Sequence, residues 1–143
     1  MSGALLILAY KRPEVLRETV NALMLAEKSG INEVIVVIQG SDEEVLQIVK
    51  DITWMKCRIF KTEYSLRTSA KEAINRNLYT DLEIAFNNSR NDYAVVIEDD
   101  ICVSRDFFNF IYSCYTKYKE DDYFRAINGF SLRPFYTFVA TPS

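Results

Sequence analysis

Apolar runs of strand length alternate with segments of helical periodicity along this chain. Four runs rich in β-branched and other apolar residues predict strands: Ala4 to Tyr10, Glu33 to Gln39, Cys57 to Thr62 and Tyr93 to Glu98. Such runs are typical of strands that are buried on both faces of a sheet.

Helical periodicity follows the first two strands. Pro13 stands where a first helical position tolerates its missing N–H, and Gly30 is a plausible stop for a helix that runs through Ser29. The expected core face of this helix recurs every three or four residues, at Leu16, Val20, Leu23 and Met24. After the second strand, "SDEE" from Ser41 to Glu44 is a capping-box signature that opens a short helix.

Two more helices are expected in the second half of the chain. A long one fills much of Thr68 to Asn88, with an inward face formed by Ala70, Ala73, Ile74, Leu78, Leu82 and Ala85. Ser104 is the expected N-cap of the helix in "RDFFNFIYSCYTKY".

The last part of the chain holds weaker signals. Phe124 to Gly129 is a candidate fifth strand, and the final "FSLRPFYTFVATPS" is strand-like but interrupted by Pro134. Its apolar "PFYTFV" is suited to cover a sheet edge or to recruit a second copy, which makes the chain a candidate homo-oligomer.

Strands that alternate with helices predict an α/β fold. The sheet should be Rossmann-like and mainly parallel, with helices on both faces, because parallel neighbours need crossovers of this length. With 143 residues, 49% of them hydrophobic, the chain is long enough for one core and too short for two, so we expect a single domain spanning residues 1–143. Ligands of such sheets bind beyond the carboxyl ends of the strands, near the point where the strand order reverses.

Charge and cysteine content limit the partners and the compartment. A net charge of −3 gives no global basic field that would attract nucleic acid or an anionic membrane. The first apolar run is much shorter than the roughly 20 residues that cross a bilayer, so no transmembrane segment is expected. The three cysteines (Cys57, Cys102 and Cys114) lack CxxC spacing and lie in apolar surroundings, which indicates reduced, buried thiols and a cytoplasmic location.

Missing residue types exclude several kinds of chemistry. The chain contains no histidine, which removes Ser-His-Asp and Cys-His nucleophile systems, HExxH zinc sites and a histidine general base. None of its four glycines forms a GxGxxG or GxxxxGK[ST] motif. A bound phosphate would therefore be held by a metal ion and side chains.

Three consecutive carboxylates, Glu98, Asp99 and Asp100, follow the fourth predicted strand. Like charges on adjacent residues repel one another, and the edge of a low-dielectric interior screens them poorly, so a positive partner is expected there. Oxygen ligands without His or Cys suit Mg²⁺ or Mn²⁺, ions that commonly bind one or two carboxylates together with water and substrate phosphates. A substrate that carries a diphosphate is the expected ligand.

Two segments resemble a known family. "VVIEDDICVSRDFFNF" closely resembles the part of N-acetylglucosaminyltransferase I and related GT-A enzymes in which an EDD version of the DXD motif precedes an aromatic-rich helix. "LLILAYKRPEVLRETVNAL" is similar to the first strand, Arg-Pro turn and first helix of these enzymes. The resemblance implies a GT-A fold and a metal-dependent glycosyltransferase that uses a nucleotide sugar, with a UDP-sugar as the expected donor and an unknown acceptor.

The resemblance also implies roles for single residues. Asp100 would bind the metal ion, Asp99 would lie near the donor ribose, and Glu98 near the transferred sugar. Arg12, in the Arg-Pro turn, would face the nucleotide. Asp42 is the nearest candidate for contact with the donor base, and the alternative is that Ser41 and Asp42 simply cap the helix.

The family continues well beyond its metal site, with segments that supply the acceptor pocket and, in inverting members, a catalytic base. This chain ends at Ser143, so we expect only the donor-binding half of the active site and assign no catalytic base. Two function classes stay open: a metal-dependent glycosyltransferase domain, and a non-catalytic or incomplete nucleotide-sugar-binding or assembly domain that needs a further segment or partner. EDD also has a simpler interpretation, as an acidic loop that stabilises a helix N-terminus. The simpler interpretation of Arg12 is a solvated arginine.

Overall fold

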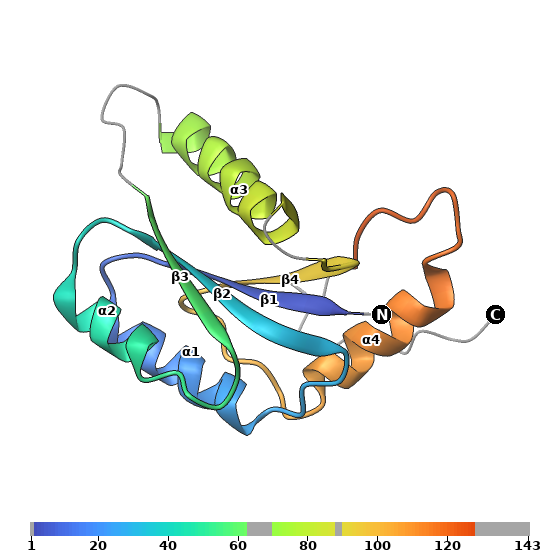
Figure 1. Ribbon diagram of the computed structural model, residues 1–143, viewed down its shortest axis with the longest axis horizontal. Coiled ribbons are helices and arrows are strands. Elements are labelled where there is room, and N and C mark those ends of the chain that lie inside the picture. Colours follow the sequence, from blue (N-terminus) through green and yellow to red (C-terminus); the bar gives the residue numbers. More distant parts are fainter. Residues whose placement is uncertain (1, 63–69, 88–89, 128–143) are drawn as a thin grey trace, which may run out of the picture.

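The computed structural model describes residues 2–62, 70–87 and 90–127, and within 70–77 it describes the backbone alone. Four strands and four helices alternate along the chain (Figure 1): β1 (Gly3–Ala9), α1 (Pro13–Leu25), β2 (Ile31–Gln39), α2 (Glu43–Lys50), β3 (Cys57–Thr62), α3 (Ala70–Asn87), β4 (Tyr93–Glu98) and α4 (Phe107–Tyr118). All four strands predicted from the sequence are confirmed.

The strands form one sheet in the order β3-β2-β1-β4, and every neighbouring pair is parallel. The central strand β1 lies between β2 and β4, with Leu6 opposite Ile35 on one side and Val96 on the other. The chain thus builds outward from β1 to β3 and then returns to add β4 on the opposite side of β1. This order fixes where the strand sequence reverses, between β1 and β4.

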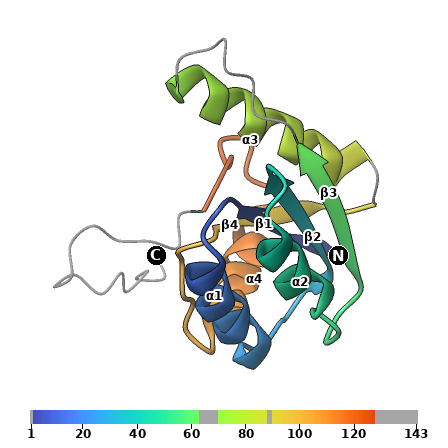
Figure 2. The same cartoon turned by 90° about the vertical axis from the view of Figure 1, so that its left-hand side faces the viewer.

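Helices cover both faces of the sheet, as predicted (Figures 1 and 2). α1, α2 and α4 lie on one face, and α3 lies on the other. Because side chains alternate along a strand, Leu5 and Ile7 of β1 join the larger core beneath α1, while Ala4 and Leu6 join a second cluster with Ala85 of α3. These side chains are fully buried, and each burial of a Leu or Ile stabilises the fold by about 1.5–3 kcal/mol.

The first helix is shorter than predicted. Pro13 opens α1 as expected, but α1 ends at Leu25 and its C-cap Ala26 is extended. The Lys28 ammonium donates to the carbonyls of Met24 and Ala26 and takes over bonds that further helical turns would make. Met24 at this frayed end is exposed, so its predicted core position is wrong.

Two predicted N-caps are displaced by one or two residues. Asp42, rather than Ser41, caps α2, and its carboxylate accepts a hydrogen bond from the Val45 amide at 3.0 Å. α4 begins at Phe107, and Ser104 instead donates its hydroxyl to the side chain of Asp106. Ser104 therefore belongs to the turn before the helix.

The long helix α3 confirms the prediction of a helix within 68–88. Ala85 is buried and Leu82 packs against the second core cluster, but Leu78 is exposed, in contrast to its predicted inward position. The predicted inward positions of Ala70, Ala73 and Ile74 lie outside the described side chains.

The candidate fifth strand is not present between Phe124 and Ile127, which are not in a strand. The Phe124 amide donates to the Asp121 carbonyl in a turn, and the Arg125 guanidinium binds the Phe124 carbonyl. These local bonds use backbone groups that a strand would offer to a neighbour. Asn128, Gly129 and the final segment 130–143 lie outside the described residues.

The remaining sequence predictions concern the cysteine thiols and the expectation that no segment spans a membrane. All three cysteines are free thiols, but the prediction that they are buried is wrong: Cys57 and Cys114 are only partly buried, and Cys102 is exposed. Among the described residues, none of the helices combines the length and the hydropathy that crossing a membrane requires.

Candidate functional site

Two sequence-predicted elements of a site meet at one edge of the sheet. Arg12 follows β1, and the carboxylate triplet follows the adjacent strand β4. Because β1 and β4 are parallel neighbours, their carboxyl ends emerge side by side, at the point where the strand order reverses. The predicted convergence of Arg12 with the triplet is confirmed by two ion pairs, from Arg12 to Asp99 and to Asp100.

The three carboxylates do not share one environment. Glu98 ends β4, and the Ile101 amide donates to its carbonyl at 3.2 Å, so Asp99 and Asp100 occupy the two central positions of a tight turn. Asp99 is buried, with 2% of its surface exposed, whereas Glu98 and Asp100 are exposed. The turn therefore reduces the repulsion that the sequence suggested, because two of the three carboxylates reach solvent.

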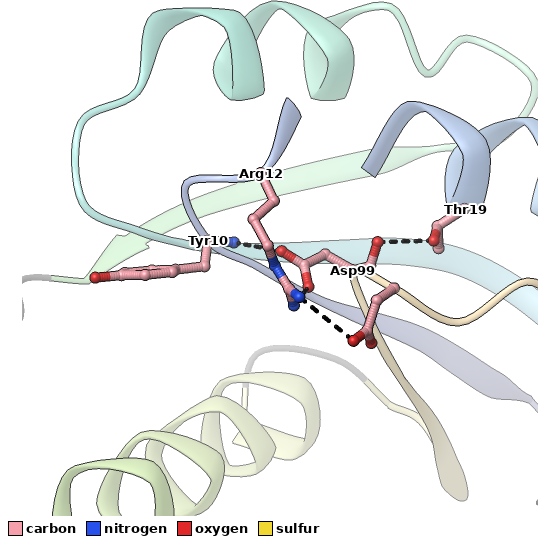
Figure 3. A network of polar contacts seen from close by, with 5 residues as sticks. Tyr10, Arg12, Thr19 and Asp99 are labelled. Carbon is pink, nitrogen blue, oxygen red and sulfur yellow. Dashed lines mark hydrogen bonds and ion pairs between the residues drawn. The ribbon is translucent and has the colours of Figure 1, made fainter. Parts of the chain in front are cut away.

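Asp99 is held on both of its carboxylate oxygens (Figure 3). The Tyr10 amide donates to Oδ2 at 3.1 Å, and Arg12 Nη2 donates to Oδ1. The hydrogen bond and the charge of Asp99 raise the pKa of Arg12, so the guanidinium is charged throughout the range in which the protein is folded. Arg12 is thus the positive partner that the triplet requires.

Asp100 is bound more weakly. Its Oδ2 lies 3.4 Å from Arg12 Nη1, and 42% of its side chain is exposed. A long contact between exposed groups contributes little to stability and is readily exchanged for another partner. Of the two aspartates, Asp100 is therefore the one that is available to a ligand, and Glu98 of the triplet is also exposed.

A residue that the sequence analysis did not single out completes the network. Thr19, on α1, is fully buried, and its hydroxyl donates to the backbone carbonyl of Asp99 at 2.8 Å. Figure 3 shows Thr19 and Arg12 approaching Asp99 from different parts of the chain. The signal in the sequence was a lone hydroxyl on the apolar stripe of α1, beside Val20 and three residues after Leu16.

Glu98 and Asp42 lie outside this network. Glu98 is exposed and, by strand alternation, lies on the α3 face of the sheet together with Ala94. Asp42 follows β2 and caps α2, which is the simpler interpretation that the sequence left open. Its predicted contact with the donor base stays a prediction.

The donor set suits a hard cation that takes most of its ligands from elsewhere. Within residues 2–62, 70–87 and 90–127, no three His, Cys, Asp or Glu side chains come together as a metal-binding group. Asp100, in the turn that follows β4, offers an exposed carboxylate. This is the arrangement expected of Mg²⁺ or Mn²⁺ sites that are completed by phosphate oxygens and water.

Solved structures of known proteins share the fold of this chain. The chain resembles the crystal structure of S. aureus TarS 1-349, with a TM-score of 0.62 at 16% identity over 83% of this chain and 33% of that one. It also resembles the mannosyltransferase PcManGT from Pyrobaculum calidifontis in complex with GDP-Man and Mn2+, with a TM-score of 0.50 at 16% identity over 73% of this chain and 29% of that one. The chain spans about a third of the length of these structures. No curated protein sequence matches it.

The family comparison covers nearly the whole chain. The model of the GNT-I family matches residues 2–131, a range that includes the Arg-Pro turn, Thr19 and the carboxylate triplet. The resemblance inferred from the sequence is thereby confirmed, as is the GT-A class of the fold. This chain belongs to the GNT-I family.

Proposed function

We propose that residues 1–143 form the donor-binding domain of a metal-dependent glycosyltransferase that uses a nucleoside diphosphate sugar. The observation that carries this proposal is the meeting of Arg12, Asp99 and Asp100 at the carboxyl ends of β1 and β4. A cation and an acidic turn at the switch point of a parallel sheet match the chemistry of a metal-bound diphosphate.

Asp100 is the proposed ligand of Mn²⁺ or Mg²⁺. It is the exposed one of the two aspartates at the centre of the turn, and its present contact with Arg12 is long. The bound ion would act as a Lewis acid toward the leaving nucleoside diphosphate. The other ligands would be phosphate oxygens and water, since Asp100 offers one carboxylate.

Arg12 is the proposed phosphate contact. It immediately precedes α1, and its side chain makes no capping bond with that helix. Its Nη1 contact with Asp100 is the weaker of its two ion pairs, so it can be exchanged for a phosphate oxygen while Nη2 stays on Asp99. The N-terminus of α1 also favours negative charge at this position.

The roles proposed for Asp99, Glu98 and Asp42 follow the family resemblance. Asp99 would lie near the ribose, Glu98 near the sugar and Asp42 near the base. Because both oxygens of Asp99 are already engaged, we propose that it acts mainly by holding Arg12 and the turn. UDP is the proposed nucleotide, and GDP is the alternative, since the related mannosyltransferase was solved with GDP-Man.

Transfer of the sugar to an acceptor is also part of this proposal. The bond from the anomeric carbon to the diphosphate oxygen would break, a bond to the acceptor hydroxyl would form, and the hydroxyl proton would pass to a base that is not assigned. The second candidate is a nucleotide-sugar-binding or assembly domain that lacks this step. Release of nucleoside diphosphate from a UDP-sugar separates the two, because only the enzyme releases it.

The three free cysteines support a reducing compartment such as the cytoplasm.

Thermal unfolding tests the donor site. We expect Mn²⁺ together with UDP to raise the melting temperature of the wild type, because a ligand at 100 times its dissociation constant stabilises the native state by about 2.7 kcal/mol. Mn²⁺ alone, UDP alone and GDP with Mn²⁺ are measured in parallel. Asp100→Asn should lose most of the gain.

Asp122→Asn is the matched control, because Asp122 is an exposed aspartate in the turn after α4. It should keep the full gain. An unchanged wild-type midpoint with every ligand would argue against a donor site in this chain, and an equal gain in Asp100→Asn would remove Asp100 from it.

A further inference from the structure

The acidic turn has one backbone group that the turn itself cannot satisfy. In the turn Glu98 to Ile101, the Glu98 carbonyl accepts the closing hydrogen bond from the Ile101 amide. The carbonyl of Asp99 points out of the ring that this bond closes, so it needs another partner where it is buried. Thr19 supplies that partner through a hydroxyl on α1, 80 residues away in the sequence.

That carbonyl belongs to the peptide that decides the form of the turn. Turns of types I and II differ by the orientation of the peptide that links their two central residues, and type II requires a positive φ at the second of them. No non-glycine residue in the described part of the chain has a positive φ, so Asp100 is not in that conformation. The Thr19 hydrogen bond, at 2.8 Å, stabilises the orientation of the Asp99–Asp100 peptide that the structure shows.

The Thr19 hydrogen bond fixes the Asp99 carbonyl and, through the rigid peptide plane, the backbone nitrogen of Asp100, which is one of the atoms on the Asp100 Cα that set the direction of its side chain. Tyr10 and Arg12 bind the side chain of Asp99, whereas Thr19 binds its backbone carbonyl. Its hydroxyl lies where no solvent reaches, with 0% of the residue exposed, so water cannot replace it.

We propose that Thr19 is a positioning residue for the metal ligand Asp100: its hydroxyl locks the central peptide of the acidic turn and thereby aims the Asp100 carboxylate at the mouth of the sheet. The proposal rests on the proposed function in so far as Asp100 binds a metal ion. Partners that orient metal ligands in this way typically change metal affinity by about 10–100-fold when they are lost.

The test compares variants that differ in a single hydroxyl. Thr19→Val keeps the shape of the side chain and removes its donor, and Thr19→Ser keeps the donor and removes the methyl group. Thr62→Val is the matched control, because Thr62 ends β3, at the opposite edge of the sheet from β4, and its buried Oγ1 has no hydrogen-bond partner within the described residues. Thr19→Ala against Thr19→Ser gives the same comparison should Thr19→Val fail to fold.

The first readout is the affinity for Mn²⁺ in the presence of UDP, measured from the electron paramagnetic resonance signal of free Mn²⁺. We expect Thr19→Val to bind about tenfold more weakly, and Thr19→Ser and Thr62→Val to stay within about twofold of the wild type. Wild-type affinity in Thr19→Val would overturn the proposal. So would an equal loss in Thr19→Ser, which would assign the effect to packing of the methyl group.

The second readout needs no metal ion. The amide ¹H–¹⁵N signals of Asp100 and Ile101 report the orientation of the turn peptide in the ligand-free protein. They should shift or broaden in Thr19→Val and return close to their wild-type positions in Thr19→Ser. If the wild type binds no Mn²⁺ with UDP, the proposed function fails, while unchanged amide signals in Thr19→Val would overturn the role of Thr19 itself.

Discussion

At the scale of single residues, two neighbouring aspartates of similar sequence context have opposite structural roles. Asp99 is buried and bound on both oxygens, whereas Asp100 is half-exposed and bound by one long contact. The sequence identified the triplet but not this division of roles, because it depends on the turn and on Arg12 and Thr19, which are 80 or more positions away in the chain. Contacts at that separation leave no periodic signal in the sequence.

Stability measurements distinguish the two aspartates. We expect Asp99→Asn to lower the free energy of unfolding by about 1–3 kcal/mol, since it removes a charged acceptor from Arg12 in a buried setting. Asp100→Asn should change it by less than about 1 kcal/mol, as is usual for an exposed ion pair. Urea unfolding of both variants without metal measures the difference. Similar losses in the two variants would contradict the division of roles.

At the scale of elements, the interior of each strand was predictable and the ends of the helices were not. The strands could be predicted because they are runs of apolar residues, and burying these residues stabilises the fold more than any alternative local structure would. β3 and β4 have the predicted bounds. α1 ended early because the Lys28 side chain binds its last carbonyls. The free-energy difference between such a capping bond and a further helical turn is small. Hydrophobic periodicity alone therefore does not predict the residue at which the helix ends.

α3 also contains a buried carboxylate that its hydrophobic periodicity did not predict. Asp81 lies on the buried side of this helix, with 1% of its surface exposed, and its Oδ1 has no hydrogen-bond partner in the described part of the chain. Burial raises the pKa of Asp81 to about 6 from an ordinary value of 3.8. α3 therefore packs on the sheet at the cost of a desolvated carboxylate.

This feature predicts a pH dependence of stability. The native Asp81 carboxyl binds its proton more tightly than the unfolded one, so the native state takes up a proton as the pH falls through about 6. The free energy of unfolding should rise from pH 7.5 toward pH 5 and stop gaining from Asp81 below its unfolded pKa. Asp81→Asn should be more stable than the wild type at pH 7.5, and its advantage should shrink by pH 5. Urea unfolding across this range checks the sign, and a constant difference between the two proteins would contradict it.

At the scale of the whole molecule, the two faces of the sheet are covered in different ways. On one face, α1, α2 and α4 share a continuous core with Leu5, Val36 and Val95 of three neighbouring strands. On the other, the described side chains of α3, residues 78–87, bury only Asp81 and Ala85, while Tyr79 and Phe86 are exposed. The fold class could be predicted from the order of elements. The different coverage of the two faces could not, because the predicted inward face of α3 did not indicate how few side chains of residues 78–87 are buried.

The asymmetry predicts how the molecule opens. Residues 78–87 of α3, with few buried apolar side chains, should separate from the sheet in a local fluctuation, whereas β1, buried on both faces, should exchange its amide protons only on global unfolding. Native-state hydrogen exchange at increasing urea concentrations measures both. We expect amides of 78–87 to exchange with a lower free energy and a weaker urea dependence than those of Leu5 to Ile7, and Asp81→Asn to raise that free energy at pH 7.5. The acidic turn is tied to α1 through Thr19, on the tightly packed face, so the Ile101 amide, which donates to the Glu98 carbonyl, should stay protected when α3 opens. Joint exchange of 78–87 with the turn would show instead that the site and α3 open as one unit.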